Sequence, residues 1–340
     1  MSAGGPWPAG AATGVGSMPG SDPVEAARTI VGELPDLPHL PELPARGLGA
    51  DLVGRTAALL VDLAIEEVTS GYRVVARAGR DHHRAVSLLR TDLDAFEEAL
   101  ERAGARPRVV KVQAAGPWTL AAGIELRTGH RVLTDDGALR EFTSSLAEGL
   151  AQHAAEVARR TGATVVVQLD EPSLPAVLTG RLPTPSGLGT VAPVAAADAQ
   201  AALRTVLAAL PGPGIVHCCA KDPPVGLLRA AGADAVSIDL AQVLGTDAVD
   251  ALGQALDDGA TLLLGLVPAL EPPAAPALRD VAAPALRLVD RLGFPRATLA
   301  DRAVPTPACG LAGATPRWAR RALELARDTG RAFVEPPESW

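Results

Sequence analysis

The chain has 340 residues, a formal net charge of −8 and 48% apolar residues. That size suits one large domain or two modest ones, and the negative charge without any Lys/Arg block excludes a nucleic-acid-binding surface. No apolar run approaches the roughly 20 residues of a membrane span. Three cysteines and no signal-peptide pattern predict a cytoplasmic protein in a reducing compartment.

Short apolar bursts alternate with Ala- and Leu-rich helical stretches along the chain. Residues 1–11 are expected to be disordered, and no linker divides the rest. The bursts predict strands at 12–18, 38–44, 108–114, 164–170, 214–219, 234–240, 261–267 and 297–302. Eight strand–helix units predict an α/β fold, a single (β/α)8 TIM barrel over residues 1–340, with an open doubly wound sheet as the alternative.

One connection is too long for a simple strand–helix unit. Residues 45–107 separate the second predicted strand from the third, so we expect an extra element there. The stretch "YRVVARAG" (72–79) predicts a hairpin within it. Earlier in the chain, Ser21 and Asp22 before Pro23 predict the start of a helix.

Polar residues gather at the C-terminal ends of the predicted strands, where TIM-barrel active sites lie. Side chains alternate between the two faces of a strand. His217 and Cys219 therefore point the same way, while Cys218 points toward the helical layer. The same alternation places Gln168 with Asp170. These polar side chains are predicted to face the mouth of the barrel.

Four potential metal ligands are predicted to meet at this mouth: His217, Cys219, Asp239 and Cys309. An imidazole, two thiolates and a carboxylate suit a tetrahedral Zn²⁺ site. Buried structural residues remain the alternative, because an H-x-C pair alone is a weak zinc signal. A redox pair of Cys218 and Cys219 is disfavoured, since a disulfide between neighbours is strained.

Six short motifs occur in order over nearly the whole chain: "GSMP" (16–19), "AGPWTL" (115–120), "QLDEP" (168–172), "HCC" (217–219), "SID" (237–239) and "CGL" (309–311). With these motifs the sequence resembles the cobalamin-independent methionine synthase family. The resemblance is to its catalytic C-terminal barrel in a compact core form. This family lies within the barrel superfamily that also contains uroporphyrinogen decarboxylase.

The resemblance implies two sets of site residues. The first would hold zinc: His217, Cys219, Asp239 and Cys309. The second would bind homocysteine: Gly16, Ser17, Met18, Glu42, Gln168, Asp170 and Glu171. Asp170 would pair with the substrate amino group, and Asp239 would be the catalytic ligand that yields to the substrate. For Glu171, a bracing role in its loop is the open alternative.

The function implied by the resemblance is zinc-dependent methyl transfer to the thiol of homocysteine, giving methionine. The sequence departs from the family where Asp239 replaces glutamate, and where "GLVPALEPP" (265–273) lacks the histidine associated with protonation during methyl transfer. The missing histidine leaves a methyl-corrinoid and 5-methyltetrahydrofolate both open as the methyl donor. Zinc matters because coordination deprotonates a thiol without a general base.

Three alternatives remain at this stage. The acceptor could be another small thiol such as coenzyme M. A uroporphyrinogen-type decarboxylase would need no zinc and would use arginines to hold substrate carboxylates, which the thiol and imidazole groups disfavour. A non-catalytic barrel would retain only a structural metal or a regulatory role. The expected partners are therefore a small thiol and a methyl donor, with neither nucleic acid nor a membrane.

Overall fold

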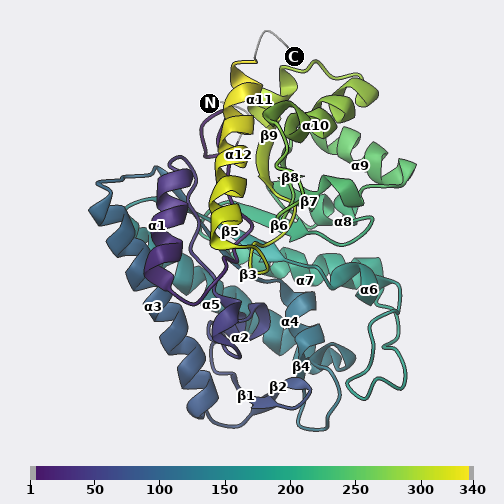
Figure 1. Cartoon of the computed structure of the whole chain (residues 1–340). Helices are drawn as coiled ribbons and strands as arrows, with labels where there is room; N and C mark the ends of the chain where they lie inside the picture. The colour runs from purple at the N-terminus through teal and green to yellow at the C-terminus, as the bar shows by residue number, and fades with distance from the viewer. Residues whose placement is uncertain (1–4, 337–340) are drawn as a thin grey trace.

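A sheet of six parallel strands forms the centre of the computed structural model, which describes residues 5–336. The strands are β3 (Val109–Ala115), β5 (Thr164–Asp170), β6 (Gly214–Cys218), β7 (Ala235–Asp239), β8 (Thr261–Val267) and β9 (Ala303–Pro307). Their order in the sheet follows their order in the chain. Parallel neighbours need long crossovers, and helices lie in the segments between them (Figure 1).

Five of the predicted strands are confirmed to within one residue, from the third to the seventh. The predicted eighth strand, 297–302, is wrong. Most of it forms a short helix, α11 (Thr298–Arg302), and the strand follows as β9. The two prolines of β9, Pro305 and Pro307, concealed this strand in the sequence because proline cannot donate to a strand ladder.

The first two predicted strands do not form regular strands. Residues 12–18 and 38–44 instead make isolated parallel bridges, Ser17 with Glu42 and His39 with Lys111. The amide of Thr13 also donates to the carbonyl of Pro305 in β9, at 3.3 Å. These segments thus lie between the two edge strands of the sheet. The architecture is a curled six-stranded sheet, and a complete eight-stranded barrel is not confirmed.

The two faces of the sheet carry different side chains. One apolar cluster takes a residue from each of the six strands and the residue directly before each irregular segment, namely Ala11, Leu37, Val109, Val166, Ile215, Ala235, Leu263 and Val304. Contact among residues from all six strands requires the sheet to curl around this cluster. The alternate positions, such as Val167, Cys218 and Ile238, pack in the large core beneath the helices. The predicted alternation of inward and outward residues is confirmed.

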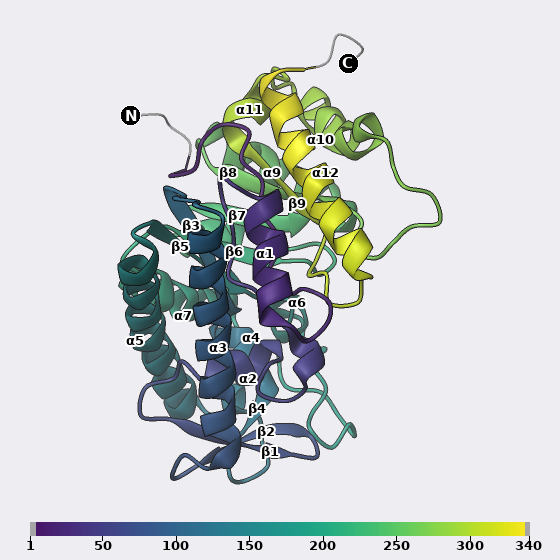
Figure 2. The same ribbon diagram turned by 60° about the vertical axis from the view of Figure 1, so that its left-hand side comes forward.

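Helices cover the outer face of the sheet, as Figures 1 and 2 show from two directions. The longer ones are α1 (Pro23–Glu33), α3 (Arg80–Arg102), α5 (Asp136–Thr161), α7 (Ala196–Ala209), α9 (Thr246–Asp257), α10 (Leu278–Leu292) and α12 (Pro316–Val334). The shorter ones are α2 (Leu52–Ala57), α4 (Pro117–Gly123), α6 (Leu174–Leu178) and α8 (Val225–Ala230). The predicted start of α1 is confirmed, since Asp22 accepts from the amide of Val24 at 2.9 Å.

The expected extra element before the third predicted strand is a hairpin. Strands β1 (Ala64–Val68) and β2 (Gly71–Val75) pair antiparallel, and β4 (Ile124–Glu125) pairs parallel with β2. Both views place this small sheet at the opposite end of the molecule from the last turns of α12 (Figures 1 and 2). It is joined through α4 to the carboxyl end of β3, the side on which the polar strand ends gather.

The N-terminal segment is partly described. Residues 1–4 lie outside the described residues, while Ala11 is buried and belongs to the inner cluster. The expected disorder therefore does not extend to Ala11. That residues 1–340 form a single domain stays a prediction. Among the described helices, none combines the length and apolar character that crossing a membrane would require.

Candidate metal and substrate site

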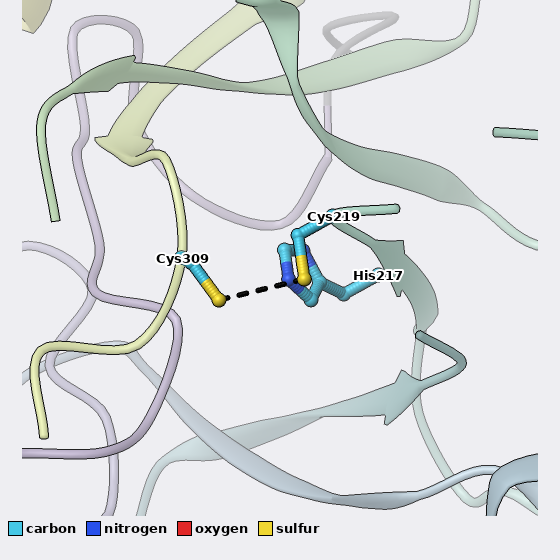
Figure 3. A group of neighbouring side chains, drawn as sticks. All are labelled: His217, Cys219 and Cys309. Atoms are coloured by element: carbon cyan, nitrogen blue, oxygen red, sulfur yellow. Dashed lines mark hydrogen bonds between the residues drawn. The ribbon is translucent and has the colours of Figure 1, made fainter. Parts of the chain in front are cut away.

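Three side chains with soft donor atoms meet at the carboxyl ends of the strands. His217 lies on β6, Cys219 follows β6 directly, and Cys309 follows β9. The donor atoms of all three lie within 4.8 Å of one another, and the two sulfur atoms are 3.4 Å apart (Figure 3). Of the four predicted ligands, the structure thus brings three together.

The imidazole of His217 is oriented toward this group. Its Nδ1 lies 2.8 Å from the Oγ of Ser237, its neighbour on β7. Its Nε2 is buried and has no hydrogen-bond partner among the described residues. A buried nitrogen without a partner is costly, so a ligand there would relieve the cost. Fixing one ring nitrogen by a hydrogen bond is also the usual way to orient a metal-binding histidine.

The spacing of the three donors fits zinc. Zn–S bonds of about 2.3 Å and Zn–N bonds of about 2.0 Å at tetrahedral angles give donor separations of roughly 3.5–3.8 Å. The observed 3.4 Å between the sulfurs of Cys219 and Cys309 is close to that range. Two thiols and an imidazole are also the donor types that zinc prefers. The residues present therefore suit this metal.

The two thiols differ in their proton affinity. The hydrogen bond with Cys219 and the neighbouring imidazole of His217 lower the pKa of Cys309 to about 4. The same hydrogen bond, together with burial, raises the pKa of Cys219. A thiolate is thus favoured at Cys309 without a metal, and a cation beside the pair would favour the second one. Cys218 faces the helices, where burial raises its pKa to about 12.

Asp239, the fourth predicted ligand, is not in this group of donors. It ends β7, and its Oδ1 accepts a hydrogen bond from the amide of Ala241 at 3.0 Å. This bond caps the short 3-10 helix η3 (Leu240–Gln242) that follows. The turn therefore binds an oxygen of the short Asp239 carboxylate. The side chain is half-buried, and burial raises its pKa.

Asp170 lies at the end of β5, next to His217 in the strand register. Its Oδ1 accepts from the side-chain amide of Gln168 at 2.7 Å. The oxygen of that amide accepts from Lys111 at 2.8 Å, and Lys111 also donates to the carbonyl of Val15 at 2.9 Å. Gln168 is therefore a buried link that orients Asp170, rather than a free contact for substrate.

Burial shifts the pKa values of the acid and the base in this network. It raises the pKa of Asp170 to about 6 and lowers the pKa of Lys111 to about 8. Lys111 was not among the predicted site residues. The sequence nevertheless contained a signal for this residue. Lys111 interrupts the apolar run "RVVKVQA" at an inward-facing position, two residues before Gln113. An inward lysine in a barrel interior needs buried acceptors or acids as partners.

The turn at Gly16–Met18 connects residues predicted to bind substrate with the segment that carries a candidate metal donor. The amide of Met18 donates to the carbonyl of Glu42 at 2.8 Å, and the amide of Leu311 donates to the carbonyl of Ser17 at 2.8 Å. A Cβ at Gly16 would lie 2.9 Å from the Glu42 carboxylate, so only glycine permits this approach. Ser17 and Glu42 thus lie beside the segment that carries Cys309.

The side chains of two predicted substrate residues make contacts elsewhere in the fold. The side chain of Met18 is buried in a separate apolar cluster with Trp318, so only its backbone faces the turn. The Glu171 carboxylate accepts from the amides of Trp118 and Thr119 at 2.9 and 2.8 Å and from the Thr119 hydroxyl at 2.7 Å. Glu171 thus caps α4, which fits the bracing alternative and leaves neither oxygen for substrate.

Comparison with known families agrees with the motifs. A family model described as the catalytic domain of cobalamin-independent synthase matches residues 10–332. The chain belongs to this family. The family is of the methionine synthase type and its members are methyltransferases, which confirms the predicted resemblance. A comparison with curated proteins gives no match.

One solved structure supports the fold. A B12-independent methionine synthase from Shewanella sp. W3-18-1, in complex with selenomethionine, has a TM-score of 0.61 at 13% identity, covering 96% of this chain and 98% of that one. Lower similarity is found to a putative lyase/mutase from Burkholderia cenocepacia J2315 (TM-score 0.39, 14% identity, 96% and 87% covered). A GH113 beta-1,4-mannanase gives a TM-score of 0.42 at 9% identity, with 97% and 99% covered. At 13% identity the likeness to the methionine synthase shows the fold alone, and nothing is inferred from the other two.

Proposed function

We propose that this protein is a zinc-dependent methyltransferase that moves a methyl group to the thiol of homocysteine and so forms methionine. The observation that carries the proposal is the group of His217, Cys219 and Cys309, whose donor atoms lie within 4.8 Å of one another. Zinc at these residues would supply the positive charge that keeps a substrate thiol deprotonated at neutral pH. Three protein donors leave one tetrahedral position for that thiol.

The protein's own acids would bind the other end of the substrate. Asp170 and Glu42 are both buried, and the negative charge of each raises the pKa of the nearby Lys111. Asp170 is held by Gln168, and Glu42 by its backbone bonds to the Gly16–Met18 turn. An ammonium group between two such carboxylates would be strongly favoured, because a buried acid is stable only with a positive partner.

These carboxylates also favour one class of thiol over another. Homocysteine carries an ammonium group that would complement Asp170 and Glu42. Coenzyme M carries a sulfonate, which the same two acids would repel. The amino thiol is therefore the better acceptor for this site.

We also infer that residues 12–18 and 38–44 take the places of the first two strands of an eight-stranded barrel. The parallel bridges of Ser17 with Glu42 and of His39 with Lys111 support this view. In that arrangement Ser17 and Glu42 would stand at the mouth of the barrel with the ends of the other strands. Catalytic residues from the ends of several strands are typical of such barrels.

The test is methionine formation from homocysteine by the zinc-loaded protein, with methylcobalamin and 5-methyltetrahydrofolate assayed in parallel. A metal-free sample is the control. We expect methionine with at least one donor, and only when zinc is present. Turnover with the corrinoid alone would follow from the missing histidine after β8, because a folate leaving group needs a proton. No methionine with either donor would contradict the proposal.

A further inference from the structure

Arg55 forms a buried ion pair behind Glu42. Its Nε lies 3.6 Å from Glu42 Oε1, and both residues are more than nine-tenths buried. Its Nη1 donates to Oδ2 of Asp92, a fully buried residue on α3. Arg46 donates to the same oxygen at 2.7 Å. The four side chains form one line of alternating charge that ends at the substrate site.

The short helix α2 holds Arg55 in this place. Asp51 caps the helix by accepting from the amide of Gly54 at 3.1 Å, and the hydroxyl of Tyr72 on β2 donates to the same carboxylate. The hydroxyl of Thr56, the residue after Arg55, accepts from the amide of Ala115 at the end of β3 at 2.7 Å. The helix is thus fixed on one side by the hairpin and on the other by the sheet.

The geometry leaves one oxygen of the Glu42 carboxylate, Oε1, without a hydrogen bond among the described residues. At 3.6 Å the contact with Arg55 is an ion pair and not a hydrogen bond. Glu42 Oε1 is buried and has no hydrogen-bond partner among the described residues, and neither has Nε of Arg55. Asp92 holds Arg55 through Nη1, while Nε, the Arg55 atom nearest Glu42, stays beyond hydrogen-bond distance. A carboxylate in this state can still accept from a ligand.

We propose that Arg55 is a positioning residue for the substrate: held by Asp92 through Nη1, it favours the charged form of Glu42 and leaves Oε1 of Glu42 free for the ammonium group of an amino thiol. This inference rests on the proposed function, since it assigns Glu42 to the amino end of that substrate. It also assigns a role to the β1–β2 hairpin, because Tyr72 on β2 supports the helix that carries Arg55.

The surroundings of Glu42 agree with this role. Burial raises the pKa of Glu42 to about 7, and Arg55 is the strongest influence that opposes the rise. Lys111 on β3 opposes it as well, while Asp170 on β5 adds to it. A rise of one further unit in the pKa of Glu42 would lower its ionised fraction at pH 7 from about one half to about one tenth. Without Arg55, Glu42 would be mostly protonated and would bind an ammonium group poorly.

The experiment compares two thiols that differ only in the amino group, L-homocysteine and 4-mercaptobutanoate. Calorimetric titration of the zinc-loaded protein at pH 7 gives the Kd of each. For Arg55→Met we expect the Kd of homocysteine to rise about fivefold or more, with the Kd of the analogue unchanged. Arg55→Lys should restore part of the loss. Arg160→Met is the matched control, since Arg160 pairs with Asp94 and Glu97 far from the site and should change neither Kd.

Equal changes in both Kd values, or none for homocysteine, would overturn the role of Arg55. If Arg55→Met does not fold, Asp92→Asn serves instead. It frees Arg55 to occupy Glu42 and should weaken homocysteine binding alone, and an unchanged preference would again refute the idea. Wild-type protein that binds neither thiol would refute the proposed function and this inference together. Wild-type protein that prefers homocysteine, with a variant that does so equally, would refute only the inference.

Discussion

Replacing Cys309 by serine removes one of the three donors that the structure brings together. A serine hydroxyl keeps its proton at neutral pH and is a poor zinc ligand. Protein zinc sites with four ligands bind with about 10–16 kcal/mol, so an equal share for one ligand is roughly 2.5–4 kcal/mol. At about 1.4 kcal/mol for each factor of ten, Cys309→Ser should raise the zinc Kd roughly 100- to 1000-fold.

Competition with a chromophoric chelator at pH 7.5 would measure this Kd, and mass spectrometry after dialysis would give the zinc content. Cys218→Ser is the matched control, because Cys218 is adjacent to the site in sequence but packs in the core beneath the helices. Its zinc Kd should stay within about twofold of wild type, since it offers no donor to the group. A Cys309→Ser protein that binds zinc as tightly as wild type would refute the assignment.

Three further predictions concern the residues that surround the site. Glu171→Gln should lower the free energy of unfolding by about 2–4 kcal/mol, because the amide meets donors of α4 that now bond to a carboxylate. Tyr72→Phe should lower it by about 1–3 kcal/mol, because the amide of Gly49 loses its acceptor, and homocysteine binding should also weaken. For Glu42, whose pKa burial raises from 4.5 to about 7, the stability of wild type relative to Glu42→Gln should fall as the pH rises through that window. The unfolded chain releases its proton first, whereas the folded protein holds it until about pH 7.

Chemical denaturation, repeated across pH for Glu42, checks these three. Glu156→Gln is the control for Glu171, since Glu156 is exposed and pairs only with its helix neighbour Arg159, a type of pair worth little. A Glu171→Gln protein as stable as the control would exclude the capping role. An unchanged Kd for homocysteine in Tyr72→Phe would show that the hairpin does not support substrate binding. A constant stability difference between pH 4.5 and 7 would show that Glu42 is not perturbed by burial.

Regular alternation made much of the fold readable in advance. The strands β3 and β5–β8 are near-continuous apolar runs, and their inward and outward positions follow from a period of two. That period alone separates Cys219 from Cys218, and it places His217 and Cys219 on the face that carries the site. The same period puts Lys111 at an inward position, but it was not predicted as a site residue. Such features depend on neighbours along the chain and therefore leave a local pattern.

Other features depended on which distant segments come into contact. Residues 12–18 and 38–44 have apolar bursts, but they form isolated bridges to each other and to β3 in place of regular strands. Asp239 stands at the right strand end, yet the turn after it takes its carboxylate. Sequence motifs report the residue type at a position, and they do not report which competing hydrogen bond a side chain will make.

The chain's local pattern was thus enough to predict the parallel strand–helix architecture, the family motifs and four candidate ligands at the strand ends, of which the structure brings three together. The packing of segments far apart in sequence decided the rest. It joined Glu171 to α4 and Arg55 to Asp92 across 37 positions. Buried charges must find partners wherever the fold brings them, and no periodicity along the chain encodes that choice.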